Sequence, residues 1–145
     1  MIDTHTIPNF DTRFLVAIKG GSSPENYILM ESWRRTEGLF PNSKAKWNPL
    51  HTSYYIDGFT ESLDYNTSGP VRNYKYEFAG LAATILTVTI HETDGTMRYG
   101  GIISDLQKGA KTADQIVNDR MSQFAKWGTD VQLLLEVISD VRAGR

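Results

Sequence analysis

Helix-start signals recur along this chain and constrain its fold more than any other feature of the sequence. Ser23–Pro24 is typical of an N-cap followed by the first helical residue. The segments Thr112–Gln115 and Thr129–Gln132 each match a capping box, in which two side chains bond the free backbone N–H groups of a helix start. The sequence therefore predicts three helices that begin at these points.

Apolar residues at helical spacing support the first of these helices and predict others. Leu29, Trp33 and Thr36 recur at that spacing, and Gly38 is expected to end their helix in the left-handed conformation. Further helices are expected over residues 14–18, 78–91 and 102–108. A turn at Asp94–Gly95 is expected to follow the second of these.

A long segment without helical spacing separates the first half of the chain from the second. Residues 40–73 are rich in Pro, Gly, Asn, Ser, Thr and Tyr, and loops of this length are usually functional. We therefore expect a mainly α-helical (α+β) domain over residues 13–145, with one long aromatic-rich loop or small β region. Residues 1–12, in which Pro8 opposes a helix, are expected to form an extended N-terminal arm.

Composition excludes several classes of function. The net charge is −2 and no basic block is present, so a nucleic-acid partner is not expected. Cysteine is absent, which removes disulfides, thiol nucleophiles and thiolate metal sites. The three histidines are far apart without ligand spacing, so neither a metal nor a cofactor is expected. No signal peptide is visible and no stretch is apolar enough for a membrane span.

Glu37 is the side chain with the clearest chemical potential. It falls on the last turn of the helix that begins at Pro24, where the backbone carbonyl dipoles disfavour a negative charge. Its proton should therefore be held more tightly than in an isolated glutamate. An acid that stays protonated near neutral pH is what cleavage of a glycosidic bond requires. The alternative is a solvated glutamate at a helix end.

An ordered set of short motifs surrounds and follows this glutamate. They are WxxxEG at 33–38, NPLxT at 48–52, NxxGxVxNY at 66–74, FAGLAAT at 78–84, YGGI at 99–102 and WGT at 127–129. In this order they resemble the lysozyme-like domains of tailed bacteriophages, which occur in virion or tail-associated proteins that degrade cell walls. They are similar, more distantly, to bacterial glucosaminidases and transglycosylases. Many relatives have a second glycine where this chain has Leu39, and residues 90–98 form a longer segment than usual.

The resemblance, which spans about residues 24–130, implies a helical lysozyme-like fold with a cleft for peptidoglycan glycan strands. It implies that Glu37 is the general acid. It also implies that four residues line the cleft: Asn48, Thr52, Asn73 and Tyr74. Tyr65 is a further candidate contact, because aromatic rings of the long loop can stack on the apolar faces of sugars.

Glycoside hydrolysis normally uses a second carboxylate, about 5 Å away as a nucleophile or about 6.5–9.5 Å away as a base. Asp57, Glu61 and Asp64 all lie in the long loop. We choose Glu61, because loops of this kind fold over the cleft. Lytic transglycosylases of this fold need only one carboxylate, so an enzyme that relies on Glu37 alone is an alternative.

The sequence therefore predicts a phage tail- or virion-associated peptidoglycan glycosidase that cuts the β-1,4 glycan backbone. We expect it in the virion or in the cytoplasm of the infected cell. Glycan strands and other phage tail or virion proteins are the expected partners. Two alternatives stay open: a catalytically inactive structural component of a tail tip or baseplate that retains the fold, and a glycan-binding module that does not cut.

Overall fold

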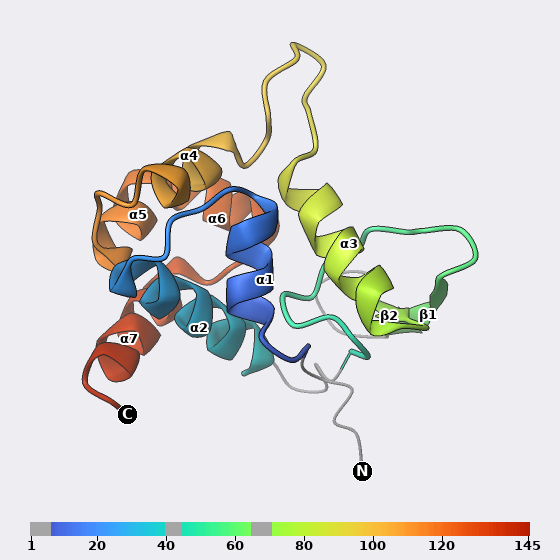
Figure 1. Ribbon diagram of the computed structural model, residues 1–145, viewed down its shortest axis with the longest axis horizontal. Helices are drawn as coiled ribbons and strands as arrows, with labels where there is room; N and C mark the ends of the chain where they lie inside the picture. Colours follow the sequence, from blue (N-terminus) through green and yellow to red (C-terminus); the bar gives the residue numbers. More distant parts are fainter. Residues whose placement is uncertain (1–6, 40–44, 65–70) are drawn as a thin grey trace.

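The structure is a computed structural model that describes residues 7–39, 45–64 and 71–145. Within these ranges the chain is mainly α-helical with one small sheet, as the sequence predicts (Figure 1). The elements are α1 (Phe10–Ala17), α2 (Pro24–Gly38), β1 (Thr60–Asp64), β2 (Val71–Tyr74), α3 (Glu77–Val88), α4 (Gly100–Lys108), α5 (Ala113–Asp119), α6 (Met121–Trp127) and α7 (Val131–Arg142). Among the described residues, no helix has the length and apolar character needed to cross a membrane.

The helices form two groups around a shared core. Figure 1 shows α4 to α7 gathered around α2, with α3 and the sheet on the other side and α1 between them. Trp33 of α2 is fully buried at the centre, and its ring meets the edges of Phe124 and Trp127 at centroid distances of 5.1 Å each. Helix α2 is therefore the element against which the site is built.

The start of α2 is as predicted, but its end differs. The Ser23 side chain accepts a hydrogen bond from the backbone N–H of Asn26 at 3.2 Å, and Pro24 is the first helical residue. The expectation of a left-handed stop at Gly38 is wrong, because Gly38 stays helical and Leu39 follows with φ −82°. The Leu39 N–H bonds to the Thr36 carbonyl at 3.3 Å and closes the last turn. Glu37 nevertheless stays in that turn.

The two predicted capping boxes have different outcomes. The box at Thr112 is confirmed, with both of its hydrogen bonds to and from Gln115 present. The box at Thr129 is wrong, because the N-cap of α7 is Asp130, whose carboxylate accepts from the N–H of Leu133 at 3.0 Å. The helix therefore begins one residue later, and the Thr129 hydroxyl is left for another role.

The N-terminal boundary also needs correction. Helix α1 begins at Phe10, within the range expected to be an extended arm, after Asn9 in the left-handed conformation with φ 54°. Ile7 and Phe10 are both 3 % exposed, and the rings of Phe10 and Phe14 lie 5.7 Å apart. Burial of Phe10 in the core therefore extends the helix toward the N-terminus. Residues 1–6 of the expected arm lie outside the described residues.

Helix α3 ends at Val88 instead of near His91, and residues 89–99 connect it to α4 through an excursion whose middle projects from the body of the molecule (Figure 1). The excursion returns on itself, since His91 and Met97 form a β-bridge and the Arg98 N–H bonds to the Ile90 carbonyl at 2.8 Å. Gly95 has φ 87° at its tip, which confirms the predicted turn. The excursion thus brings Arg98 back to Ile90, just after the C-terminal end of α3.

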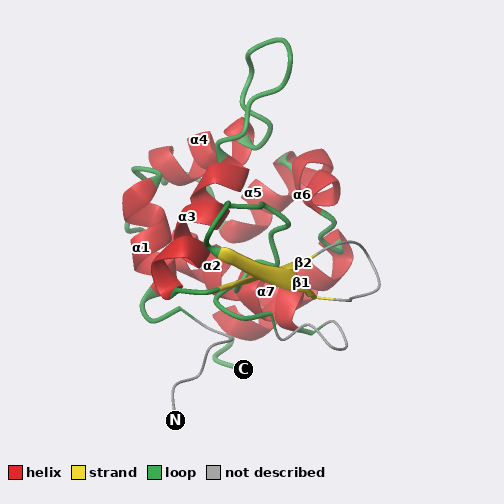
Figure 2. Ribbon diagram, turned by 90° about the vertical axis from the view of Figure 1, so that its right-hand side faces the viewer, coloured by secondary structure: helices red, strands yellow, loops and turns green. Residues whose placement is uncertain are grey.

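The long segment contains the predicted small β region. Strands β1 and β2 pair antiparallel, with Thr60 opposite Tyr74, and Figure 2 shows the pair beside the start of α3. The loop before β1 packs closely on α3 at Gly80. A Cβ on Gly80 would lie 1.7 Å from the carbonyl oxygen of Trp47, so only glycine fits there. This contact holds the residue 45–59 loop against α3.

Candidate functional site

Glu37 is buried and held by a chain of two hydrogen bonds. The residue is 4 % exposed, and its Oε1 accepts from the Thr129 hydroxyl at 2.7 Å. That hydroxyl in turn accepts from the Trp33 indole N–H at 3.2 Å. Trp33 and Glu37 are four residues apart on α2 and therefore share one face of the helix. We call these three residues the Glu37 hydrogen-bond chain.

Thr129, the middle residue of the Glu37 hydrogen-bond chain, is positioned by the end of α6. Gly128 follows Trp127 with φ 97°, a left-handed conformation that ends the helix and turns the backbone toward α2. The next residue is Thr129, and Asp130 then caps α7. The WGT motif therefore delivers a buried hydroxyl to Glu37, a role that the sequence interpretation assigned to neither Gly128 nor Thr129.

Burial raises the pKa of Glu37 from 4.5 to about 7. The hydrogen bond from Thr129, and a further one from Trp33, act in the opposite direction because they favour the ionised carboxylate. The direction agrees with the expectation from the sequence, but the leading cause is burial. Near neutral pH the Glu37 carboxyl is thus present in comparable amounts as acid and as carboxylate.

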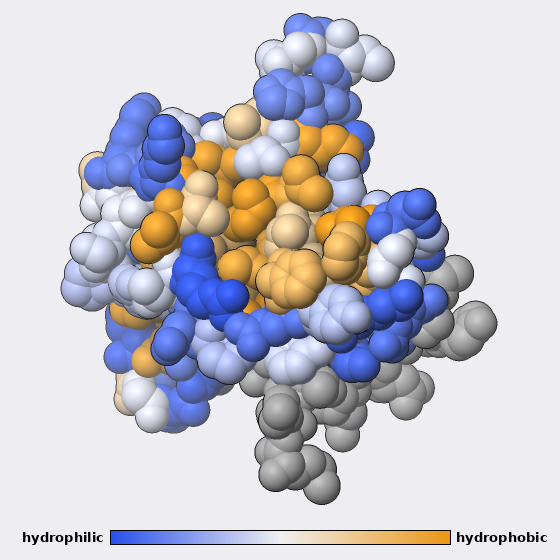
Figure 3. All heavy atoms as spheres, turned by 45° about the vertical axis from the view of Figure 1, so that its right-hand side comes forward, coloured by the Kyte–Doolittle hydropathy of each residue, from blue (hydrophilic) through white to orange (hydrophobic). Residues whose placement is uncertain are grey.

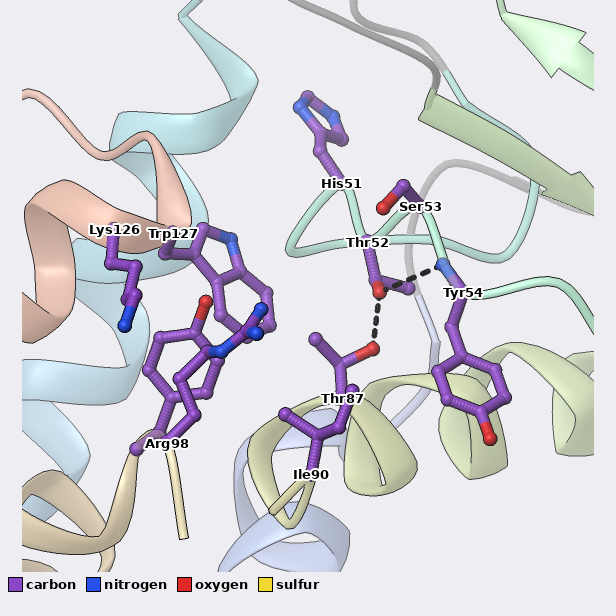
Figure 4. A pocket seen from close by; sticks show the side chains of 10 residues that line it. His51, Thr52, Ser53, Tyr54, Thr87, Ile90, Arg98, Lys126 and Trp127 are labelled. Atoms are coloured by element: carbon purple, nitrogen blue, oxygen red, sulfur yellow. Dashed lines mark hydrogen bonds between the residues drawn. The ribbon is translucent and has the colours of Figure 1, made fainter. Parts of the chain in front are cut away.

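A cavity of about 210 Å³ lies beside Trp127, whose ring packs on Trp33, but Glu37, Trp33 and Thr129 are not among its lining residues (Figure 4). Figure 4 shows His51, Thr52 and Tyr54 facing Arg98, Lys126 and Trp127 across the cavity. The full lining is His51, Thr52, Ser53, Tyr54, Thr87, Ile90, Arg98, Tyr99, Lys126 and Trp127. Aromatic rings, hydroxyls and cations therefore share one small space.

Trp127 connects the cavity to the Glu37 hydrogen-bond chain. Its ring lines the cavity and meets Trp33 edge-on at a centroid distance of 5.1 Å. Its other neighbours fix its orientation, since the ring packs on Tyr99 at 5.1 Å and its indole N–H donates to the Leu50 carbonyl at 3.1 Å. The Trp127 ring thus lies between the cavity and Trp33, whose indole N–H donates to Thr129.

The opposite wall is polar and ordered by hydrogen bonds. The Thr52 hydroxyl is bonded to the Thr87 hydroxyl of α3 and accepts from the Tyr54 N–H at 3.2 Å, as the dashed lines in Figure 4 mark. Thr52 is the only one of the predicted glycan contacts within the described residues that lines this cavity. It is 2 % exposed, so its role as a contact stays a prediction.

Asn48 organises this wall from behind. It is fully buried, and its amide N–H₂ donates to the carbonyls of Thr52 at 2.8 Å and Arg72 at 2.9 Å. Its carbonyl oxygen accepts from the Thr52 N–H at 2.9 Å. The side chain thereby ties the NPLxT loop to β2. The structure gives Asn48 this structural role, and its contact with glycan stays a prediction.

Asn73 and Tyr74 also connect β2 to the preceding loop. Asn73 accepts from the Lys46 N–H at 2.8 Å, and the fully buried Tyr74 donates its hydroxyl to the Tyr54 carbonyl. Glycan contacts by these two residues stay predictions. Tyr65 lies outside the described residues.

Glu61, the predicted second carboxylate, lies on β1 and is exposed. Its Oε1 pairs with the Lys46 ammonium at 3.0 Å. Asp57, one of the other two candidates, is also exposed and accepts from the Tyr55 hydroxyl at 3.4 Å. The catalytic role of Glu61 therefore stays a prediction that rests on the sequence.

A charged group at the cavity rim was not anticipated from the sequence. The Glu92 carboxylate accepts from Arg98 at 2.9 Å and 3.4 Å, and from the Lys126 ammonium at 3.0 Å. The hydrogen bond from Arg98, followed by that from Lys126, lowers the pKa of Glu92, so the group carries one negative and two positive charges. Residues 34 positions apart make this contact, so no local pattern could reveal it.

Over the described ranges, no group of three or more His, Asp or Glu side chains is arranged to hold a metal ion. No family model, curated protein or solved structure matches this chain. The function of the site must therefore be inferred from its own chemistry.

Proposed function

We propose that this protein is a glycosidase that cuts the β-1,4 glycan backbone of peptidoglycan, with Glu37 as the general acid. The observation that carries the proposal is the Glu37 carboxyl itself, which is 4 % exposed with a pKa of about 7. A general acid works best when its pKa lies near the working pH. The cavity of about 210 Å³ is connected to Glu37 only through Trp127 and Trp33, and the rings of Trp127 and Tyr99 in its lining support a sugar as the ligand.

The hydrogen bond from Thr129 supports an assignment of the proton to one Glu37 oxygen. Thr129 accepts from Trp33 and donates to Oε1, so Oε1 is occupied as an acceptor. The acidic proton then belongs on Oε2. In the proposed reaction Oε2–H protonates the leaving glycosidic oxygen as the bond to the anomeric carbon breaks. The resulting carboxylate is stabilised by the Thr129 hydroxyl, which donates to it.

Two routes complete the proposed reaction. With Glu61 as the second carboxylate, water adds to the anomeric carbon and gives up a proton to a carboxylate base, and a reducing sugar is released. Without it, the substrate's own hydroxyl adds to that carbon and returns a proton to the Glu37 carboxylate, and an anhydro product forms, as in lytic transglycosylases. Both routes use the same proton from Glu37.

The proposal includes a lysozyme-like fold and a setting in a phage tail or virion. Support for both comes from the ordered motifs between residues 33 and 129, together with the mainly helical architecture. The proposed partners are peptidoglycan glycan strands and other tail or virion proteins. The proposed location is the virion or, before assembly, the cytoplasm of the infected cell.

Glu37→Gln tests the proposal, because glutamine keeps the size and the Thr129 hydrogen bond but has no proton to donate. Purified cell walls are incubated with each protein, and reducing ends and anhydro-muropeptides are quantified. The variant should release neither at a measurable rate while its circular dichroism spectrum is unchanged. Glu31→Gln is the matched control on the same helix, since Glu31 forms a partly exposed pair with Arg35 at 3.6 Å and does not bond to Thr129 or Trp33 in the described hydrogen bonds. Activity of Glu37→Gln equal to that of the control would exclude the mechanism.

An exposed apolar face favours a second candidate, a catalytically inactive structural component of a tail tip or baseplate. Figure 3 shows apolar side chains gathered on the face that α1 and α3 share. Val16 of α1 and Phe78 and Leu86 of α3 are 71 %, 57 % and 42 % exposed. Contiguous apolar patches of this kind mark contact surfaces. No clearing on a murein zymogram, together with stable incorporation into virions, would favour this candidate over the enzyme.

A further inference from the structure

Two cations stand between two hollows of the surface. Arg98 and Lys126 line the 210 Å³ cavity beside Trp127, and they also line a neighbouring depression of about 460 Å³ with Ser122, Gln123 and Ala125. We call Arg98 and Lys126 the cationic ridge. A ligand that fills the cavity and continues into the depression must pass over both side chains.

The ridge has more positive charge than its own partner neutralises. The single carboxylate of Glu92 is shared, with Oε1 at 2.9 Å from Arg98 Nε and 3.0 Å from Lys126 Nζ. The three groups therefore carry a net charge of +1. The Arg98 and Lys126 side chains are 35 % and 56 % exposed, so a ligand can reach them. A neutral sugar would not neutralise this charge, whereas a carboxylate on the ligand would do so through charge-assisted hydrogen bonds.

We propose that the cationic ridge binds a carboxylate of the substituent on the amino sugar, as that substituent leaves the cavity for the neighbouring depression. The inference rests on the proposed function and deepens it, because it specifies an acidic, substituted glycan over a neutral one. Two sources offer the same chemistry: the lactyl carboxylate of a glycan without peptides, and the carboxylates of a peptide stem. Both project from the sugar ring and suit a site at the exit of a cavity.

The excursion that follows α3 builds this site. Glu92 and Arg98 both belong to residues 89–99, and the bond from the Arg98 N–H to the Ile90 carbonyl fixes their relative position. Lys126 comes from α6, one residue before Trp127. The segment after α3 therefore supplies Arg98 and its partner Glu92, and α6 supplies Lys126.

Binding is measured by calorimetry in the Glu37→Gln background, so that the ligand is not cleaved. Three probes are compared: a neutral N-acetylglucosamine oligomer, peptidoglycan glycan stripped of its peptides, and glycan fragments that keep them. Arg98→Gln and Lys126→Gln should each weaken binding of a carboxylate-bearing probe about fivefold, the size of an exposed ion pair. Tighter binding of the peptide-bearing probe than of the stripped one would assign the carboxylate to the stem, and the reverse to the lactyl group.

The direction in which Glu92→Gln changes the affinity for acidic probes tests the inference most sharply. It removes the competing carboxylate and leaves both cations, so it should tighten binding of the acidic probes about threefold and increase their salt sensitivity. A variant that merely damaged the loop would weaken binding. Lys108→Gln is the charge-matched control, because Lys108 ends α4 and lines neither hollow.

Weaker or unchanged binding in Glu92→Gln, or equal effects of Arg98→Gln and Lys108→Gln, would overturn the inference. An oligonucleotide that binds as tightly as the acidic glycans would assign the ridge to polyanions in general and also overturn it. The proposed function fails separately, if the wild-type protein cleaves no glycan. If the protein cleaves glycan but its binding does not depend on charge, the proposed function stands and only the inference about the cationic ridge fails.

Discussion

Replacement of Glu37 by glutamine should make the protein more stable above neutral pH while it removes activity. The folded protein holds the Glu37 proton with a pKa of about 7, against 4.5 for an unperturbed glutamate. Because a tenfold difference in proton affinity corresponds to about 1.4 kcal/mol, ionisation of this carboxyl costs the folded state about 3 kcal/mol. Glutamine has the same shape and does not ionise. It avoids that cost and keeps the bond from Thr129.

The sign of the pH dependence follows from the raised pKa. The folded state binds the proton more tightly than the unfolded chain, so this stabilisation is complete below about pH 4.5 and is lost as the pH rises to about 7. Glu37→Gln and wild type should therefore have similar free energies of unfolding near pH 4.5. Near pH 8 the variant should be more stable by about 2–3 kcal/mol.

Urea unfolding followed by tryptophan fluorescence measures both free energies, since Trp33 lies in the core beside Glu37. Glu31→Gln is the control and should change stability by less than about 0.5 kcal/mol at either pH. The reasoning is refuted if Glu37→Gln has the same advantage at both pH values, or if it is less stable than wild type near pH 8. Either result would mean that burial does not hold the proton.

Three further substitutions test the structure around the site. Thr129→Val should raise the pKa of Glu37 from about 7 to about 8, because it removes a hydrogen bond that favours the carboxylate; ¹³C NMR of the labelled carboxyl measures this, and Thr129→Ser, which keeps the hydroxyl, should not change it. Asn48→Ala should lower the free energy of unfolding by about 2–4 kcal/mol, since it leaves the buried backbone groups of Thr52 and Arg72 without the amide; a loss below about 0.5 kcal/mol in urea unfolding would contradict the structural role of Asn48. Gly80→Ala should lower the free energy of unfolding by at least about 2 kcal/mol, because its Cβ would lie 1.7 Å from the Trp47 carbonyl oxygen. Ala82→Gly, at an exposed position of the same helix, is the control and should show only the ordinary effect of glycine on helix stability, about 1 kcal/mol in urea unfolding.

Local signals predicted much of the helical framework because caps and spacing act within a few residues. Ser23–Pro24 and the box at Thr112 each satisfy backbone groups of their own helix, and both begin helices where expected. Glu37 could be singled out for a similar reason, since a single helix end with a following glycine places it. Its main pKa perturbation nevertheless comes from burial, which only tertiary packing provides.

The errors arose where a distant contact decided a local choice. Thr129 and Asp130 can both cap α7, and Asp130 does so while Thr129 bonds to Glu37, 92 positions earlier in the chain. Phe10 begins α1 because the core accepts its ring, although Pro8 opposes a helix just before it. The group of Glu92, Arg98 and Lys126 likewise joins a turn to a separate helix. None of these outcomes follows from spacing alone.

The pH dependence of glycan cleavage tests the central claim most directly. If Oε2 of Glu37 donates the proton, kcat/KM on purified peptidoglycan should be constant below the pKa of about 7. Above that pKa it should fall about tenfold for each pH unit. Thr129→Val should move that fall upward, in line with its effect on the carboxyl. A cleavage rate that stays constant or rises from about pH 7 to about pH 9 would contradict Glu37 as the acid.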